Sequence, residues 1–146
     1  IFNDALEELV RSRELERRAD HVRPATEHAP SEAFDRRARI ITTYFESYRF
    51  AARAAATLLA GGTLTRKDWV RQALALGQAG LSSGEVLLHE SIAKPRFENA
   101  ISSFRDHVLV HVTDTGGLAL ADGVASARSL HELEAKLALF CPTRRG

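Results

Sequence analysis

An apolar seam in the first half of this 146-residue sequence constrains the fold more than any other feature. Apolar residues recur at alternating spacings of four and three at Phe34, Ala38, Ile41, Phe45, Tyr48, Ala52, Ala55 and Leu59. That spacing places them on one side of a helix over about four heptads. Ser31 is suited to begin this helix as its N-cap, and Gly61 and Gly62 to end it. The sequence therefore predicts one long helix that anchors the core and lies between neighbouring elements.

Two further helices are predicted after Gly62. Thr65 and Asp68 form a capping-box pattern, and the apolar residues that follow predict a helix of about three to four turns, with Gly80 and Gly84 at its exit. These apolar residues are Trp69, Val70, Ala73 and Leu74, followed by Gly77. Pro95 suits the first turn of the next helix, on which the four-three-four spacing returns at Phe97, Ile101, Phe104 and Val108. Both helices are expected to pack against the long one.

Shorter elements complete the expected architecture. Val108 to Val112 and Leu118 to Leu120 flank a turn with two glycines and predict a β-hairpin. Ser129 and Glu132 form a capping-box pattern for a last helix, which carries Leu130, Leu133, Leu137 and Phe140 and ends at Pro142.

The N-terminal segment is expected to hold a helix and a linker. Asn3 to Asp20 reads as a half-solvated helix, with Ala5, Leu6, Leu9 and Val10 on its apolar side. His21 to Pro30 reads as a linker. We therefore predict a mainly α fold, a helical bundle of about five helices with one short β-hairpin. Residues 1–30 form an N-terminal helix and linker that could belong to a preceding region, and residues 31–146 form a helical C-terminal domain.

Composition excludes several classes of protein. The formal net charge of +1 gives no strong field for nucleic acid or anionic lipid. Cys141 is the single cysteine, so no intrachain disulfide can form, and a reducing cytoplasm fits. Arg49 and Arg53 interrupt the best apolar run, so no membrane span is expected, and no signal-peptide pattern is present. The chain starts at Ile1 and contains no methionine, from which we expect a piece of a longer protein.

Three sequence patterns suggest chemistry, but each has a simpler interpretation. Gly80 to Gly84 spell G-x-S-x-G, which would make Ser82 a nucleophile only if a strand led into it, whereas a helix is predicted there. His107 and His111, with Asp114, have the spacing of an open zinc site but lack the glutamate of H-E-x-x-H, which favours a solvated strand face. His89 and Glu90 follow an apolar run, and no second catalytic partner can be named. We therefore predict no catalytic, cofactor-binding or metal-binding residue and no cofactor.

The order of elements allows a second function. Two helices followed by a glycine-turned hairpin is also the order in a winged-helix DNA-binding domain, and the second half of the chain follows it. The residues facing DNA would then be Lys94, Arg96, Asn99, Ser103 and Arg105, with the hairpin as the wing. Glu98 and Asp106 offset part of this charge, and the loop before Pro95 is longer than a helix-turn-helix needs. We keep a winged-helix-type DNA-binding or protein-interaction module as the alternative, and do not expect nucleic acid as a partner.

Four consecutive segments carry a resemblance to a known family. YFESYRFAARAAATLL, GTLTRKDWVRQALALGQ, a glycine-containing loop and SIAKPRFENAISSFRDH with its hairpin resemble the C-terminal region of bacterial glycerol-3-phosphate 1-O-acyltransferases. The mitochondrial and dihydroxyacetone-phosphate acyltransferases are similar there. The resemblance covers about Phe34 to Ala121.

The resemblance implies a function for the parent protein. Members of this family transfer an acyl group from acyl-CoA or acyl carrier protein to the 1-hydroxyl of glycerol 3-phosphate in phospholipid biosynthesis. They use an upstream H-x-x-x-x-D motif, whereas the residues five positions after the six histidines here are Thr26, Ala33, Lys94, Val112, Gly116 and Lys136. The resemblance thus implies a helical C-terminal domain that packs on an upstream acyltransferase domain. It also implies a membrane-associated parent, cytoplasmic or peripheral on the inner face of the cell membrane.

Overall fold

The computed structural model describes residues 7, 10–13, 15–19, 22–24, 32–56, 58, 62–122, 124 and 126–141. The chain divides into two compact units, residues 1–40 and residues 41–146. Helix α2 (Glu32–Ala55) begins in the first unit and continues into the second.

The first unit contains a short antiparallel hairpin. Strands β1 (Leu15–Arg17) and β2 (Val22–Pro24) pair so that Leu15 lies opposite Pro24. The predicted helix up to Asp20 is therefore wrong at β1, and the predicted linker is wrong at β2, although Glu7, Val10 and Arg11 are helical. The helix prediction fails because Arg13 adopts a left-handed backbone, with φ of 58°, and the charged run after it has no apolar face to bury. Ser12 and Arg13 form a turn, Arg18 and Ala19 belong to neither a helix nor a strand, and the other residues of both predictions lie outside the described ranges.

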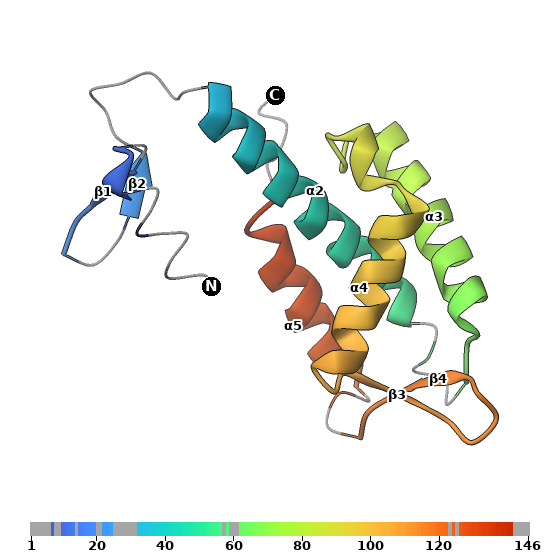
Figure 1. Cartoon of the computed structure of the whole chain (residues 1–146). Helices are drawn as coiled ribbons and strands as arrows, with labels where there is room; N and C mark the ends of the chain where they lie inside the picture. Colours follow the sequence, from blue (N-terminus) through green and yellow to red (C-terminus); the bar gives the residue numbers. More distant parts are fainter. Residues whose placement is uncertain are drawn as a thin grey trace. The chain divides into compact units, whose positions relative to one another are not determined.

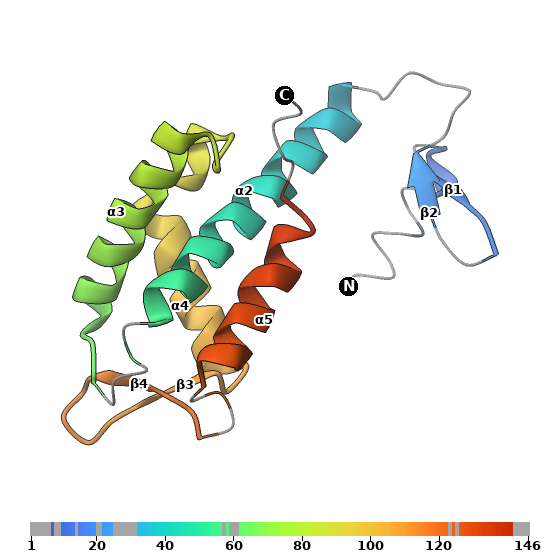
Figure 2. The ribbon, with the colours of Figure 1, turned by 180° about the vertical axis from the view of Figure 1, so that it is seen from behind.

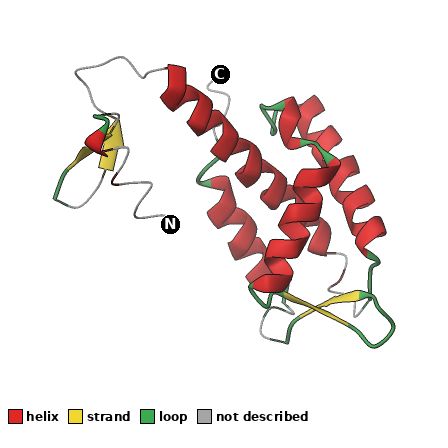
Figure 3. Ribbon diagram, in the orientation of Figure 1, coloured by secondary structure: helices red, strands yellow, loops and turns green. Residues whose placement is uncertain are grey.

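The second unit is a helical bundle with a hairpin at one end (Figures 1 and 3). Its further elements are α3 (Arg66–Ser83), the short 3-10 helix η2 (His89–Ser91), α4 (Lys94–Asp106), β3 (Val110–Val112), β4 (Leu118–Leu120) and α5 (Ala127–Ala138). Figures 1 and 2 both show α2 between α5 and the pair α3 and α4. The mainly helical fold with a hairpin is confirmed, with four α-helices rather than about five among the described residues.

The hairpin is joined by a third extended segment. Within it, Val110 lies opposite Leu120 and Val112 opposite Leu118. Leu64, just before α3, exchanges two backbone hydrogen bonds with Leu118, with N···O distances of 3.1 and 2.9 Å. The order is therefore α2, the β-bridge at Leu64, α3, α4 and the β3–β4 hairpin. It agrees with the winged-helix-like order that is predicted for the second half of the chain.

The core forms where α2, α3 and α4 meet. Trp69, Phe50, Phe97 and Ile101 are almost fully buried there. The indole Nε1 of Trp69 donates a hydrogen bond of 3.0 Å to the backbone oxygen of Ala51, so the one polar atom of this side chain is satisfied. The alanines of α2 let the other helices approach closely; Ala51, Ala52, Ala54 and Ala55 are all buried.

The predicted apolar seam of α2 is wrong in its N-terminal half. Ala38 and Ile41 are exposed and Phe45 is half-buried, whereas Tyr48 packs against the core and Ala52 and Ala55 are buried, as expected. The side chain of Phe34, together with Ser31, Leu59 and Gly61, lies outside the described residues, and α2 itself ends at Ala55. The buried face instead includes Thr43, Glu46, Ser47 and Phe50.

Hydrogen bonds explain why polar residues, in place of the predicted apolar ones, lie on the buried face of α2. The hydroxyl of Ser47 lies 2.6 Å from the backbone oxygen of Thr43 and 2.7 Å from that of Ser91. The carboxylate of Glu46 accepts hydrogen bonds from the Leu87 amide at 2.9 Å and from the Ser91 hydroxyl. Burying polar groups that have such partners costs little folding free energy. A search for apolar residues at helical spacing does not find them.

Three element boundaries also differ from the prediction. Thr65 is the N-cap of α3 as predicted, with its hydroxyl accepting a hydrogen bond from the Asp68 amide at 3.1 Å. However, α3 continues through Gly80 and is capped by Gly84. The N-cap of α5 lies three residues before the predicted one, because it is Ser126, whose hydroxyl accepts a hydrogen bond from the Ser129 amide. Val108, predicted on the apolar face of α4, is 71% exposed just after the helix ends.

Candidate functional site

Neither Ser82 nor Cys141 has the surroundings of an active nucleophile. Ser82 lies in the last turn of α3, where its hydroxyl donates to the backbone oxygen of Gln78 at 3.1 Å. A helix leads into it, so the geometry of a nucleophile elbow is missing, as expected from the sequence. Burial raises the pKa of the Cys141 thiol to about 11, so this thiol stays protonated at neutral pH.

In the part of the chain that the structure describes, the histidines singled out from the sequence, His89, His107 and His111, lie in different elements. His107 is the C-cap of α4, and its Nδ1 lies 2.8 Å from the backbone oxygen of Ser103. His111 lies in β3 and Asp114 in the following turn, so the two histidines do not share one regular element. His89 and Glu90 are exposed in η2. Among the described residues, no three histidine, cysteine, aspartate or glutamate side chains gather to hold a metal ion.

The basic residues of α4 contact neighbouring protein groups. Lys94 pairs with Glu98 across one turn at 3.6 Å, and Arg105 pairs with Asp106 at 3.2 Å. The guanidinium of Arg96 lies over the ring of Tyr44, 4.3 Å from its centroid. A continuous cationic face, which binding of the DNA backbone would need, is therefore not formed on α4.

A cluster of four charged side chains connects three parts of the second unit. Arg53 of α2 donates to the carboxylate of Glu85, after α3, at 2.6 and 3.0 Å, and its Nε donates to Glu134 of α5 at 3.0 Å. Arg49 also pairs with Glu85. The hydrogen bond from Arg53 lowers the pKa of Glu85, with a further contribution from the charge of Arg49. Because every member has a partner of opposite charge within the cluster, we assign it to structure.

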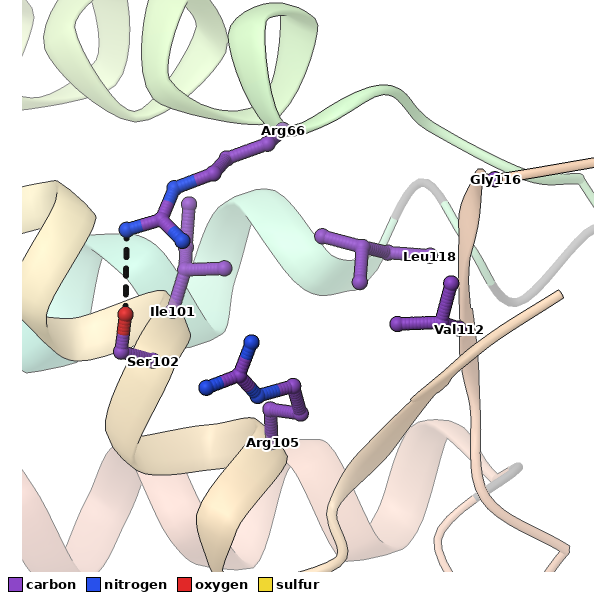
Figure 4. Close-up of a pocket in the computed structure, with 7 residues that line it drawn as sticks. All are labelled: Arg66, Ile101, Ser102, Arg105, Val112, Gly116 and Leu118. Atoms are coloured by element: carbon purple, nitrogen blue, oxygen red, sulfur yellow. Dashed lines mark hydrogen bonds between the residues drawn. The ribbon is translucent and has the colours of Figure 1, made fainter.

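One pocket brings two arginine side chains together. It has a volume of about 170 Å³ and lies between the start of α3, one face of α4 and the β3–β4 hairpin. Arg66 and Arg105 enter it from α3 and α4, together with Ser102 (Figure 4). The rest of its lining is apolar or glycine: Ile101, Val112, Gly116 and Leu118.

A second exposed feature is an apolar surface at the other end of the unit. Ile41, Tyr44 and Phe45 lie within one turn of each other on α2, and the ring of Phe45 stacks on that of Phe140 at 4.5 Å. Ile41, Phe140 and its neighbour Leu139 are 53, 59 and 81% exposed. We call these five residues, Ile41, Tyr44, Phe45, Leu139 and Phe140, the α2–α5 apolar surface.

The described helices do not include a candidate for crossing a bilayer, since none of them combines the necessary length with sufficient apolar character.

Both features depend on tertiary packing, which explains why sequence reasoning missed them. Arg105 was expected to face DNA, and Arg66 had no assigned role, because the two come together only when α3 packs on α4. Ile41 and Phe45 are predicted in the core because their spacing places them on the apolar side of the helix. That spacing alone does not show whether this side is buried or exposed. The sequence contained one indication of the pocket. Arg66 lies in the first turn of one predicted helix, and Arg105 lies in the last turn of the next.

Fold and surfaces together define a mainly helical domain in which the described residues form a small basic pocket and an exposed apolar surface. A family model described as the glycerol-3-phosphate acyltransferase C-terminal region matches residues 1–113. The chain belongs to this family, which confirms the resemblance seen in the sequence. The matched region includes α2, α3, α4 and β3, whereas β4 and α5 lie beyond it. No curated protein and no solved structure matches the chain.

Proposed function

We propose that this chain is the non-catalytic C-terminal domain of a glycerol-3-phosphate 1-O-acyltransferase, which packs on the upstream acyltransferase domain and stabilises it. The family match carries this proposal, because the family is described as a C-terminal region and so implies a domain before it. The lack of an H-x-x-x-x-D sequence after any of the six histidines supports a non-catalytic role.

The α2–α5 apolar surface is the face on which we place the upstream domain. Exposed large apolar side chains that form a contiguous surface typically mark an interaction site. Here Phe45 and Phe140 join two elements into one such surface. An upstream domain of the same chain is present in every molecule, so it can cover this surface permanently and keep its apolar side chains out of water.

The activity of the parent follows from the same proposal. The upstream domain would transfer an acyl group from acyl-CoA or acyl carrier protein to glycerol 3-phosphate, as a step of phospholipid biosynthesis. Its product is a lipid, so we place the parent in the cytoplasm, peripheral on the inner face of the cell membrane. The chain itself then contributes stability rather than a reacting group.

The test introduces a charge on the apolar surface of the complete parent enzyme. Ile41→Asp and Phe140→Asp are expected to shorten the half-life of acyltransferase activity at elevated temperature by about threefold or more, because they weaken the contact with the upstream domain. The melting temperature of the isolated 146-residue chain should change by no more than about 2 °C for Ile41→Asp, since that side chain is mainly exposed. Phe140→Asp should lower it by a few degrees more, about 2–4 °C, because the stacking on Phe45 is lost.

Val108→Asp is the matched control, because it places the same charge on another exposed apolar residue, outside the surface. The backbone of Val108 is left-handed, with φ of 57°, and aspartate tolerates this conformation better than valine, so Val108→Asp should not shorten the half-life of the parent. If Ile41→Asp and Phe140→Asp also leave the half-life unchanged, the upstream domain does not pack on this surface.

A further inference from the structure

We propose that the pocket between α3, α4 and the β3–β4 hairpin binds a phosphate monoester, with Arg66 and Arg105 as its two cationic groups (Figure 4). The β3–β4 hairpin contributes to the pocket lining. In Figure 1 this hairpin lies near the start of α5, away from the C-terminal end of that helix. The test of the pocket is independent of the acyltransferase proposal.

Arg66 is held in place by neutral groups. Its Nη2 donates to the backbone oxygen of Glu98 and to the hydroxyl of Ser102, both at 3.0 Å. Within the described residues no carboxylate pairs with this guanidinium, so its positive charge is uncompensated while its direction is fixed. Its Nε and Nη1 remain available, and they can donate to two oxygens of one phosphate.

Arg105 supplies the second cationic group from α4. Its Nε and Nη2 donate to the same oxygen of Asp106, at 3.3 and 3.2 Å. Both side chains of this pair are more than half exposed, and such a surface pair contributes little. The guanidinium can therefore turn toward an anion in the pocket at small cost. Two arginines facing one pocket match the charge of a phosphate dianion.

The remaining lining and the volume limit what the anion can be. Ile101, Val112 and Leu118 make the pocket partly apolar, which suits the carbon atoms next to the phosphate of an ester. A volume of about 170 Å³ is below the range of about 300–1,000 Å³ that drug-sized ligands fill, so a nucleotide does not fit inside. Gly116 also lines the pocket and adds no side chain to it.

Two sources share this chemistry: a small soluble phosphate monoester and the phosphate head of a lipid. Binding of inorganic phosphate and glycerol 3-phosphate to the 146-residue chain is measured by calorimetry. Binding of vesicles of phosphatidylcholine, with and without phosphatidate, is measured by co-sedimentation. Saturable binding of the soluble probes identifies the first source, and binding confined to the vesicles with phosphatidate identifies the second.

Either result supports the pocket only if it depends on the two arginines. Arg66→Gln and Arg105→Gln are each expected to weaken binding about tenfold or more. Arg71→Gln is the matched control, because Arg71 is an exposed arginine of the same helix α3 outside the pocket lining. It removes the same charge and should weaken binding less than about twofold.

A second variant separates binding from folding. Arg66→Gln removes a contact between α3 and α4, whereas Val112→Asp adds a carboxylate to the pocket at an exposed side chain. Val112→Asp should abolish binding while the melting temperature stays unchanged. The proposal is overturned if no probe binds, or if Arg71→Gln weakens binding as much as Arg66→Gln and Arg105→Gln.

Discussion

At the scale of single residues, Val108 and Gly84 hold the same position after two different helices. After α4, the amide of Val108 donates to Arg105 and that of Leu109 to Phe104. After α3, the amide of Gly84 donates to Leu81 and that of Glu85 to Gly80. Both residues are left-handed, with φ of 57° and 78°. This is the helix-ending motif in which glycine is usual, and a β-branched residue there is strained.

Val108→Gly is therefore expected to stabilise the chain by about 1 kcal/mol, because relief of the strain exceeds the added flexibility of the unfolded chain. Little packing is lost, since the valine side chain is mainly exposed. The measurement is chemical denaturation of both chains. Gly84→Val, the reverse change at the equivalent position, should destabilise by about 1–2 kcal/mol. Equal stability of Val108→Gly and the original chain would show that Val108 is not strained.

At the scale of elements, two glycines three residues apart in α3 are in different surroundings. A Cβ at Gly80 would lie 2.4 Å from Cζ of Phe50, whereas one at Gly77 would have no neighbour closer than 3.4 Å. Phe50 is fully buried and has no room to move away. Gly80 is therefore the residue that allows α3 to pack against Phe50 of α2.

Substitution by alanine should then have opposite effects at the two positions. Gly80→Ala is expected to destabilise by about 1–3 kcal/mol through overpacking. Gly77→Ala should be neutral or stabilise by up to about 1 kcal/mol, because alanine favours the helix and its methyl group fits. Thermal denaturation of the two variants checks this, and a stabilised Gly80→Ala would mean that α3 does not approach Phe50 so closely.

The charged cluster between α2, Glu85 and α5 makes stability depend on pH. The pKa of Glu85 is lowered in the folded chain, so its contribution is complete above the ordinary value of about 4.5 and is lost as pH falls through the lower folded value. We expect Glu85→Gln to reduce the fall in melting temperature below about pH 4.5. Melting curves at pH 7 and at several values below 4.5 test it. An identical fall in both chains would exclude Glu85 as a source of the acid sensitivity.

At the scale of the whole molecule, the sequence predicts elements better than it predicts faces. Capping signals and glycine turns are local, so Thr65, Pro95 and the β3–β4 hairpin were placed correctly. The buried face of α2 is not predicted correctly, because Glu46 and Ser47 are buried through hydrogen bonds to residues more than 40 positions away in the sequence. The Arg66–Arg105 pocket was missed for the same reason, since it depends on how α3 packs on α4.

The last prediction concerns the whole surface and separates the two functional classes. A DNA-binding domain needs several phosphate contacts, and its affinity then falls about 10³–10⁵-fold between 50 and 200 mM salt. This chain has a net charge of +1, and the basic residues of α4 contact Glu98, Asp106 and Tyr44. We expect no retardation of duplex DNA by the 146-residue chain at either salt concentration. Sub-micromolar binding that weakens steeply with salt would instead favour the winged-helix alternative. The two arginines of the phosphate pocket could not by themselves account for so steep a dependence of affinity on salt.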